Sequence, residues 1–229
     1  MKKKILSICL VVALIATAVV GGTLAYFSDT ESNKNVMTVG KVDIVQKEDF
    51  TPAEDLLIPK DYDLGKADYN KVVTVKNEGS LDVWTRTIVA IEHTAGDGNG
   101  ANGIAWKMNT IKGDANYDGK VFYGDLDYLK VGDKYYSVQL FTYKNTLAVG
   151  ASVDPVKGFF LSESATEADL EGLTKDAEGN YTYDVLVLSQ AVQADMNDAT
   201  TAEAALNEAF GEVSDANAAQ VAEWLAAVQ

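Results

Sequence analysis

Residues 114–125 carry oxygen-bearing side chains at a spacing that suits a bound cation. Counted from Asp114, the first, third, fifth and twelfth positions of this segment are Asp114, Asn116, Asp118 and Asp125. Gly119 stands at the sixth position, and the backbone carbonyl of Lys120 at the seventh would add one more oxygen. Calcium prefers about six to eight oxygen ligands held in flexible geometry. The spacing therefore predicts a calcium site.

The same segment resembles an EF-hand calcium loop, and a dockerin half-repeat more closely, because the twelfth position is an aspartate rather than a glutamate. A simpler interpretation is a β-hairpin, since Asp118-Gly119 is a strong type I′ turn signal between segments 106–111 and 121–123. Both interpretations stay open. Bound calcium would stabilise the folded chain by mass action, because the ion binds the folded state.

Catalytic residues are scarce in this sequence. His93 is the only histidine, and Glu92 precedes it. A zinc hydrolase needs several His or Glu ligands and a general base, often arranged as His-Glu-x-x-His on a helix. One histidine cannot supply that set, and the only cysteine is Cys9, close to the N-terminus. We therefore expect no enzyme activity and predict that His93 is a surface residue at the end of a strand.

Aromatic residues gather in the middle of the chain and offer another kind of site. They could stack on sugars, but such residues more often form cross-strand pairs in a sheet. We therefore favour pairing over carbohydrate binding for Tyr117, Phe122, Tyr123, Tyr128, Tyr135, Tyr136 and Tyr143.

The elements that would position these residues are predicted to be β-strands. Residues 81–93 alternate strictly, with Leu81, Val83 and Val89 on one face, which predicts a strand with one buried face. Six other segments are rich in Val, Ile and aromatic residues: 36–46, 69–77, 104–111, 135–144, 156–161 and 181–191. Short strands without interleaved helices predict a mainly β fold, an antiparallel jelly-roll or immunoglobulin-like sandwich.

Two short α-helices are predicted at about residues 200–228. Thr200 and Glu203 have the spacing of a capping box, and Gly211 would end the first helix. The second is expected after Ser214, with an apolar stripe at Val221, Trp224, Leu225 and Val228. This stripe is expected to dock on the sandwich; a contact with another subunit is the alternative.

Residues 1–25 are predicted to be a cleavable signal peptide. Three lysines at positions 2–4 precede the apolar run 5–20, and small residues follow it. Cleavage is expected between Ala25 and Tyr26, because Thr23 and Ala25 fit the −3 and −1 positions. A permanent membrane anchor would need roughly 20 apolar residues, so we expect no membrane span after cleavage. Residues 26–229 are predicted to form a single secreted β-sandwich domain.

The net charge of −15 limits the partners that this chain could bind. Cleavage would remove three lysines and no acidic residue, so the mature chain would carry −18. Nucleic acids and anionic membranes are polyanions, and they would repel such a surface. Cleavage would also remove Cys9, so the secreted domain would have to hold together without disulfides.

The region around the predicted cleavage site resembles the TasA/camelysin family. The resemblance is carried by Gly21-Gly22-Thr23-Leu24-Ala25-Tyr26-Phe27-Ser28-Asp29-Thr30-Glu31, by Thr38-Val39-Gly40-Lys41-Val42-Asp43-Ile44 and by Asn77-Glu78-Gly79-Ser80-Leu81-Asp82-Val83. The resemblance implies an exported protein of a Gram-positive bacterium, processed by a dedicated signal peptidase and retained at the cell surface or in the biofilm matrix. It also implies a jelly-roll or immunoglobulin-like sandwich. In fibre-forming members, an N-terminal strand of one subunit completes the sheet of the next.

The residues themselves are compatible with such assembly. Segment 26–35 is polar, and segment 36–45 follows it as a strand that could detach. Strand addition between copies uses backbone hydrogen bonds, and a head-to-tail contact that does not close gives a filament. We therefore predict a homopolymeric structural protein whose assembly is triggered by signal removal. The alternatives are a monomeric calcium-dependent binding or adhesion domain and, third, a metallopeptidase, since camelysin-type members have been classed as such.

Overall fold

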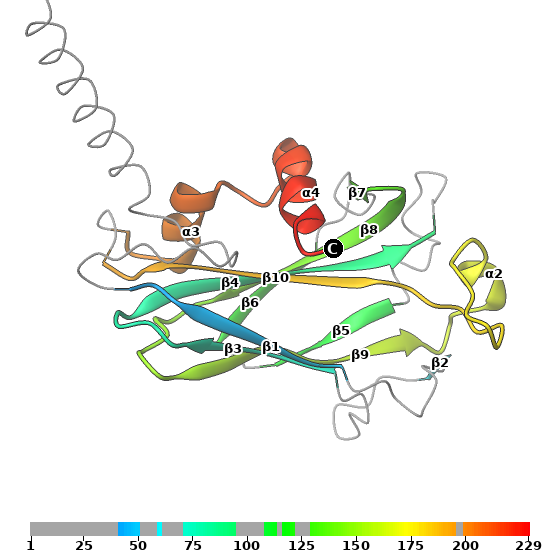
Figure 1. Cartoon of the computed structure of the whole chain (residues 1–229), viewed down its shortest axis with the longest axis horizontal. Helices are drawn as coiled ribbons and strands as arrows, with labels where there is room; N and C mark the ends of the chain where they lie inside the picture. Colours follow the sequence, from blue (N-terminus) through cyan, green and yellow to red (C-terminus); the bar gives the residue numbers. More distant parts are fainter. Residues whose placement is uncertain are drawn as a thin grey trace, which may run out of the picture.

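The computed structural model describes residues 41–50, 59–60, 71–94, 108–113, 116–121, 129–195 and 199–229. Two β-sheets face each other in these residues, and helices cover the outer face of one of them (Figure 1). The predicted signal peptide, its cleavage site at Ala25 and Tyr26, and segment 21–31 lie outside the described residues.

The upper sheet in Figure 1 has the order β10-β4-β8-β6. Its long strands are β10 (Val185–Gln193), β4 (Val83–His93) and β8 (Lys134–Tyr143). The short strands β6 (Tyr117–Val121) and β7 (Leu129–Val131) pair with opposite ends of β8. All pairings described in this sheet are antiparallel.

The lower sheet contains β1 (Ile44–Phe50), β3 (Lys71–Asn77), β9 (Ser152–Ser162) and β5 (Met108–Lys112). These pair antiparallel, whereas the two-residue β2 (Pro59–Lys60) runs parallel to the end of β9. Consecutive strands alternate between the sheets from β3 to β6 and again from β8 to β10. Such crossing between two packed sheets is jelly-roll connectivity, so the predicted mainly β sandwich is confirmed.

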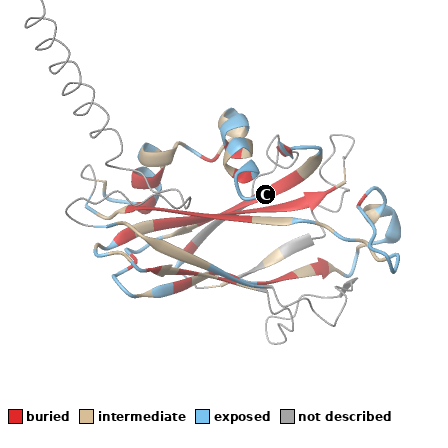
Figure 2. Ribbon diagram, in the orientation of Figure 1, coloured by how far each residue is buried: buried red, intermediate tan, exposed pale blue. Residues whose placement is uncertain are grey.

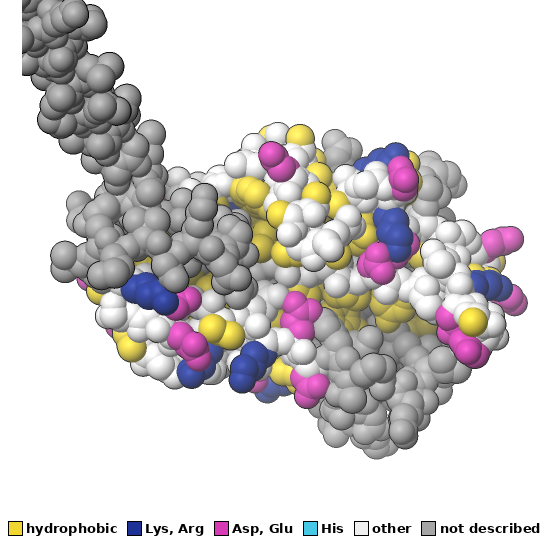
Figure 3. Space-filling model, in the orientation of Figure 1, with side chains coloured by type: hydrophobic (Ala, Val, Ile, Leu, Met, Phe, Trp, Pro, Cys, Tyr) yellow, Lys and Arg dark blue, Asp and Glu magenta, His cyan; other side chains and the backbone are white. Residues whose placement is uncertain are grey.

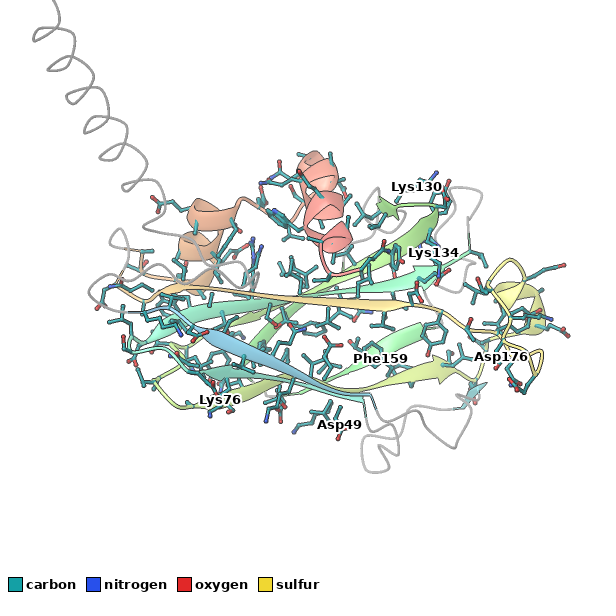
Figure 4. All side chains as sticks on the ribbon, viewed as in Figure 1. Asp49, Lys76, Lys130, Lys134, Phe159 and Asp176 are labelled. Atoms are coloured by element: carbon teal, nitrogen blue, oxygen red, sulfur yellow. The ribbon has the colours of Figure 1, made fainter. Side chains whose placement is uncertain are left out.

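The main hydrophobic core lies between the two sheets. Val73 and Val75 of β3 have no exposed surface, and Phe159 of β9 is 1 % exposed. Figure 4 shows Phe159 lying between the sheets, whereas Lys76 and Asp49 point away from the upper sheet. The alternation of buried and half-buried residues along β3 follows from the period-two geometry of a strand.

β4 is buried on both of its faces, which corrects the prediction of one buried face. Val89 and Ile91 pack into the core between the sheets, while Ile88 and Ala90 pack against the C-terminal helices. Figure 2 shows β4 and β10 buried along most of their length. The residue types alternate along β4 as predicted, but both faces are buried, because α3 and α4 cover the face opposite the core between the sheets.

The predicted C-terminal helices are confirmed as α3 (Ala202–Phe210) and α4 (Ala218–Ala226), the second preceded by the 3₁₀ turn η5 (Asp215–Asn217). Thr201, not Thr200, caps α3, and its hydroxyl accepts from the Ala204 amide at 3.3 Å. With Thr201 as the cap, the residue three positions later is Ala204, so the carboxylate that the predicted capping box needs is missing. None of the helices in the described ranges is long and apolar enough to cross a membrane.

Gly211 ends α3 with a φ of +93°, in the region that favours glycine, as predicted. The stripe on α4 docks as expected at Val221 and Leu225, both fully buried, and Trp224 packs partly against the same cluster. Val228 stays 43 % exposed.

The predicted strand segments are found with shifted ends. The segment predicted at 36–46 is a strand only from Ile44, and it continues to Phe50; residues 36–40 lie outside the described ranges. β9 begins earlier and β10 later than predicted. The sequence prediction missed β2, β7 and the short helix α2 (Glu167–Leu170), each of which is too short to show a periodic pattern.

Candidate functional site

The segment predicted to bind calcium contains β6 in place of the predicted turn. Asp118 pairs with Thr142 of β8 and Gly119 with Phe141, so both lie inside a strand. The hairpin interpretation is therefore wrong. β5 belongs to the lower sheet and β6 to the upper one, so the two segments that would have formed the hairpin do not pair.

The calcium ligand set is only partly described. Asn116 lies at the start of β6, where its carbonyl accepts from the Lys144 amide at 2.9 Å. The backbone of Lys120 is in register with Leu140 of β8. Asp114 and Asp125 lie outside the described residues. Calcium binding by Asp114, Asn116, Asp118, Lys120 and Asp125 stays a prediction.

The described aromatic residues form pairs and core contacts. Tyr117 and Tyr143 are opposite each other on β6 and β8, with ring centroids 5.2 Å apart. Tyr117 and Tyr136 are fully buried, so neither offers a face to a sugar. The cross-strand interpretation is confirmed for the pair; Phe122, Tyr123 and Tyr128 lie outside the described residues.

His93 is 4 % exposed, which corrects the prediction of a surface residue. The alternation along β4 places it on the same side as Val89 and Ile91, toward the lower sheet. Its ring lies 6.4 Å from that of Tyr135, its cross-strand neighbour, and Nδ1 is 2.6 Å from the carbonyl oxygen of Thr94. Burial at the end of a strand follows from this packing.

Glu92 is engaged on the opposite face of β4. Its Oε2 accepts from Lys134 Nζ at 2.8 Å and from the Asp184 amide at 2.7 Å. Lys134 Nζ also donates to Asp184 Oδ2 at 2.7 Å. The Glu92 side chain is 7 % exposed, whereas those of Lys134 and Asp184 are 35 % and 50 % exposed. We call Glu92, Lys134 and Asp184 the acidic clamp.

The acidic clamp changes the ionisation of its neighbours. Burial alone would lower the pKa of Lys134, but hydrogen bonds and charges of Asp184 and Glu92 raise it above its ordinary value. Burial, together with the two carboxylates, raises the pKa of Tyr136, whose hydroxyl lies 3.3 Å from Gln229 Nε2. The lysine therefore stays charged and holds β4, β8 and the chain before β10 together.

Glu92 and His93 do not fit a shared metal ion. Consecutive residues of a strand point to opposite faces, so the carboxylate and the imidazole lie on different sides of β4. The Glu92 carboxylate also accepts hydrogen bonds from Lys134 Nζ and the Asp184 amide. Within the described part of the chain, no group of three or more His, Cys, Asp or Glu side chains could hold a metal.

Arg86 is a buried cation that sequence reasoning missed. It is 1 % exposed, and its guanidinium donates to Gln190 Oε1 at 2.7 Å, Asn207 Oδ1 at 2.8 Å and the Gly211 carbonyl at 2.9 Å. The rings of Phe210 and Trp224 lie 5.8 and 5.7 Å from Arg86 Cζ. These residues connect β4 to β10, α3 and α4. The sequence signal was an arginine in the middle of an alternating strand segment, flanked by Thr85 and Thr87.

β1 is the feature that bears most directly on assembly. It is the first described strand and an edge strand of the lower sheet, paired with β3 over seven residue pairs from Ile44↔Asn77 to Phe50↔Lys71. No described side chain of residues 41–49 is fully buried, as Figure 2 shows in comparison with β4. The strand is therefore attached through its backbone ladder with β3 and through Ile44, which is half-buried against the core.

Gln46 connects β1 to the upper sheet. Its Nε2 donates to the carbonyl oxygen of Val187 on β10 at 3.1 Å and to Glu48 Oε1 at 2.5 Å. Both residues stand opposite buried valines of β3, Gln46 opposite Val75 and Glu48 opposite Val73, but Gln46 is half-buried and Glu48 is exposed. Charged and polar side chains at a sheet edge discourage further strands from pairing there without control.

The surface around the lower sheet carries charges of both signs, as the face in Figure 3 shows. The described ion pairs there, such as Lys76 with Glu78 at 2.9 Å, are exposed. Exposed pairs of this kind contribute little to stability.

Comparison with known proteins identifies a family. A family model described as camelysin metallo-endopeptidase matches residues 1–136, more than half of the 229 residues. Members of that family are surface or secreted proteins. The comparisons with curated proteins and with solved structures each found no match. The matched residues reach from the N-terminus into β8 and include β1, the turn after β3 and the whole of β4. This chain therefore belongs to the camelysin metallo-endopeptidase family.

Proposed function

We propose that this protein is an exported structural subunit that assembles head-to-tail with copies of itself into cell-surface or biofilm-matrix fibres, by exchange of the strand at the β1 position. The observation that carries the proposal is the position of β1 at the edge of the lower sheet, with no side chain fully buried among those described. β1 also precedes every other described element.

Strand exchange costs little free energy when β1 makes the same hydrogen bonds within its own subunit and with a neighbouring subunit. A β1 supplied by a second copy would make the same backbone hydrogen bonds with β3 as the chain's own β1. A contact of this kind is heterologous, so it propagates into a filament unless the rotation between subunits closes a ring.

Export would prepare the chain for this exchange. Processing between Ala25 and Tyr26 by a dedicated signal peptidase would release the segment that precedes β1. Membership of a family of surface or secreted proteins supports this order of events. An uncleaved variant that forms normal fibres would refute the idea that signal removal triggers assembly.

Electron microscopy of the purified secreted protein at high concentration and near-neutral pH tests the proposal. Fibres with a regular subunit repeat are expected. A preparation that contains monomers alone under these conditions would contradict it.

A second candidate is the peptidase activity that the family description names. Glu92 and His93 do not fit a shared metal, as argued above, so we derive no catalytic step through them. Peptide cleavage that is abolished by a chelator, and also by Glu92→Gln or His93→Ala, would establish the activity. Cleavage that survives both substitutions would place any catalytic site elsewhere.

A third candidate is a calcium-dependent surface binding or adhesion domain, which the spacing of Asp114 and Asp125 favours. Millimolar calcium should then raise the melting temperature of the protein, and Asp114→Ala should abolish that rise. No shift at millimolar calcium would contradict a site in this segment.

A further inference from the structure

The backbone that enters β1 lies against the turn that follows β3. The Glu78 amide donates to the Asp43 carbonyl at 2.8 Å, and the Ser80 amide donates to the Lys41 carbonyl at 2.9 Å. The Lys41 amide in turn donates to Ser80 Oγ at 2.8 Å. These contacts keep the register of the Ile44↔Asn77 pair, so the ladder continues past the end of β3 into the turn.

Gly79 makes this close approach possible. A Cβ atom on Gly79 would lie 2.3 Å from the Lys41 carbonyl oxygen and 2.9 Å from the Asp43 nitrogen. Both distances are below 3.0 Å, which real Cβ atoms essentially never show, and both obstacles are backbone atoms. Any side chain at Gly79 would therefore displace residues 41–43 from the turn.

Asn77 holds the turn in shape without help from β1. It is fully buried, its Nδ2 donates to the carbonyls of Leu81 at 2.8 Å and Leu147 at 3.0 Å, and its Oδ1 accepts from the Gly79 amide at 2.9 Å. The Gly150 amide donates to the Asn77 carbonyl at 2.9 Å. The turn is thus fixed by partners that remain in place when β1 leaves.

The turn is also open to solvent. A shallow hollow of about 320 Å³ lies beside it, lined by residues 76–79 together with Val149 and Gly150. Val149 is 51 % exposed there. Glu78 and Ser80, whose amides bond to the backbone of residues 41–43, are themselves exposed, so an incoming strand can reach them.

We propose that residues 77–80 form a seat that receives the extended backbone of residues 41–43 and fixes its register, and that a second copy of this chain supplies those residues in an assembly. The second copy is the fitting occupant because its residues 41–43 repeat the segment seated here. That a second copy supplies residues 41–43 rests on the proposed function, whereas the existence of the seat does not.

Gly79→Ala tests the seat. Hydrogen exchange of the backbone amides in residues 41–50 should become about tenfold faster, because the strand opens more often, while β4 and β8 keep their protection. Gly179→Ala is the control for a general loss of stability, since it strains a distant turn (φ of +89° at Gly179) while its Cβ meets nothing within 4 Å and does not touch residues 41–43. If Gly79→Ala fails to fold, Ser80→Ala removes only the bond to the Lys41 amide and should show a smaller increase. Unchanged exchange in residues 41–50 would overturn the seat.

Adding Gly79→Ala monomers to growing wild-type fibres tests whether a second copy occupies the seat. A Gly79→Ala subunit could donate its strand but not accept one, so it should stop elongation at substoichiometric amounts, whereas Gly179→Ala should not. Incorporation of Gly79→Ala at the wild-type rate would overturn the second copy as occupant. If the wild type forms no fibres, the proposed function fails, and with it the second copy as occupant, but the exchange measurement still decides whether the seat exists.

Discussion

Arg86 holds a positive charge inside the protein with no carboxylate among its described partners. Its three bonded acceptors are the side chains of Gln190 and Asn207 and the carbonyl of Gly211. Gly211 ends α3, so the guanidinium lies at the negative end of that helix, where a cation is favoured. Burial lowers the pKa of Arg86 to about 10, which still leaves it charged at neutral pH.

Arg86→Ala should lower the free energy of unfolding by about 2–4 kcal/mol, because the buried Gln190 and the half-buried Asn207 and Gly211 lose their donor. Arg86→Lys should lose much of the same stability, since an ammonium group cannot reach three acceptors in the geometry of a guanidinium fork. Urea unfolding followed by circular dichroism measures both. Lys157→Ala, at an exposed position on β9, serves as the control, and an Arg86→Lys variant as stable as the wild type would contradict this account.

The acidic clamp makes a pH-dependent contribution to stability. Lys134→Met should cost about 1 kcal/mol at pH 7, a value kept small because the lysine is partly exposed. The folded-state pKa of Lys134 is raised, so its contribution is complete below the ordinary value of 10.5 and is lost as the pH rises through the folded-state value. The difference between variant and wild type should therefore shrink above about pH 10.5. Thermal unfolding across pH measures this, with Lys76→Met as the matched control.

At the scale of single residues, the alternating pattern predicted which residues share a face of a strand but not which partners they contact. The alternating pattern placed Arg86 on the same face as Ile88, yet its acceptors come from residues more than 100 positions away. Burial of His93 was missed because its cover comes from Tyr135 across the sheet. Such contacts depend on strand register, which a periodic pattern does not specify.

Among the elements, β1 differs from the other strands in what faces the core. Gln46 and Glu48 stand opposite the buried valines of β3, yet Gln46 is only half-buried and Glu48 is exposed. Partial burial raises the pKa of Glu48, and the hydrogen bond from Gln46 opposes this effect. The charged carboxylate is therefore a source of instability in the attached strand.

Glu48→Gln should raise the melting temperature at pH 7 by about 1 °C, a small value because the side chain is exposed and solvent screens its charge. The folded-state pKa lies above the ordinary value of 4.5, so ionisation weakens the folded state above the folded-state pKa and has no effect below 4.5. The difference from wild type should thus disappear as the pH falls toward about 4.5. Glu163→Gln, at an exposed position, is the control. A lower melting temperature at pH 7 would show that the bond from Gln46 outweighs the cost of burial.

Elements with clear periodicity were predictable and short ones were not. The 11-residue β4 and both C-terminal helices were found from pattern and capping residues. The turn predicted at Asp118-Gly119 was wrong, because a local sequence signal cannot reveal that β8 pairs with this segment and keeps it extended. The edge position of β1, which supports the proposed function, depends on the order of strands in the sheet.

For the whole molecule, the architecture separates a firmly packed part from a replaceable one. The upper sheet is buried on both faces, between the core and the helices joined by Arg86. β1 lies at the edge of the lower sheet, attached through its backbone and seated at Gly79. Exchange of β1 between subunits, as proposed, would leave most of the core of the sandwich in place.

A disulfide between β1 and β3 would lock the strand in its own subunit. Val45 and Lys76 are opposite each other on the outer face of the lower sheet. Paired residues of an antiparallel ladder have Cα atoms about 4.5–5.5 Å apart, a distance that a disulfide can span. Cys9, the only natural cysteine, lies in the predicted signal peptide, so Val45→Cys with Lys76→Cys would introduce the only pair in residues 26–229.

Electron microscopy of this double variant, oxidised and then reduced, tests strand exchange most directly. The account predicts that the oxidised protein stays monomeric, that reduction restores fibres, and that the single variant Lys76→Cys forms fibres under both conditions. Fibres that grow equally well from the oxidised double variant would contradict exchange of β1 between subunits.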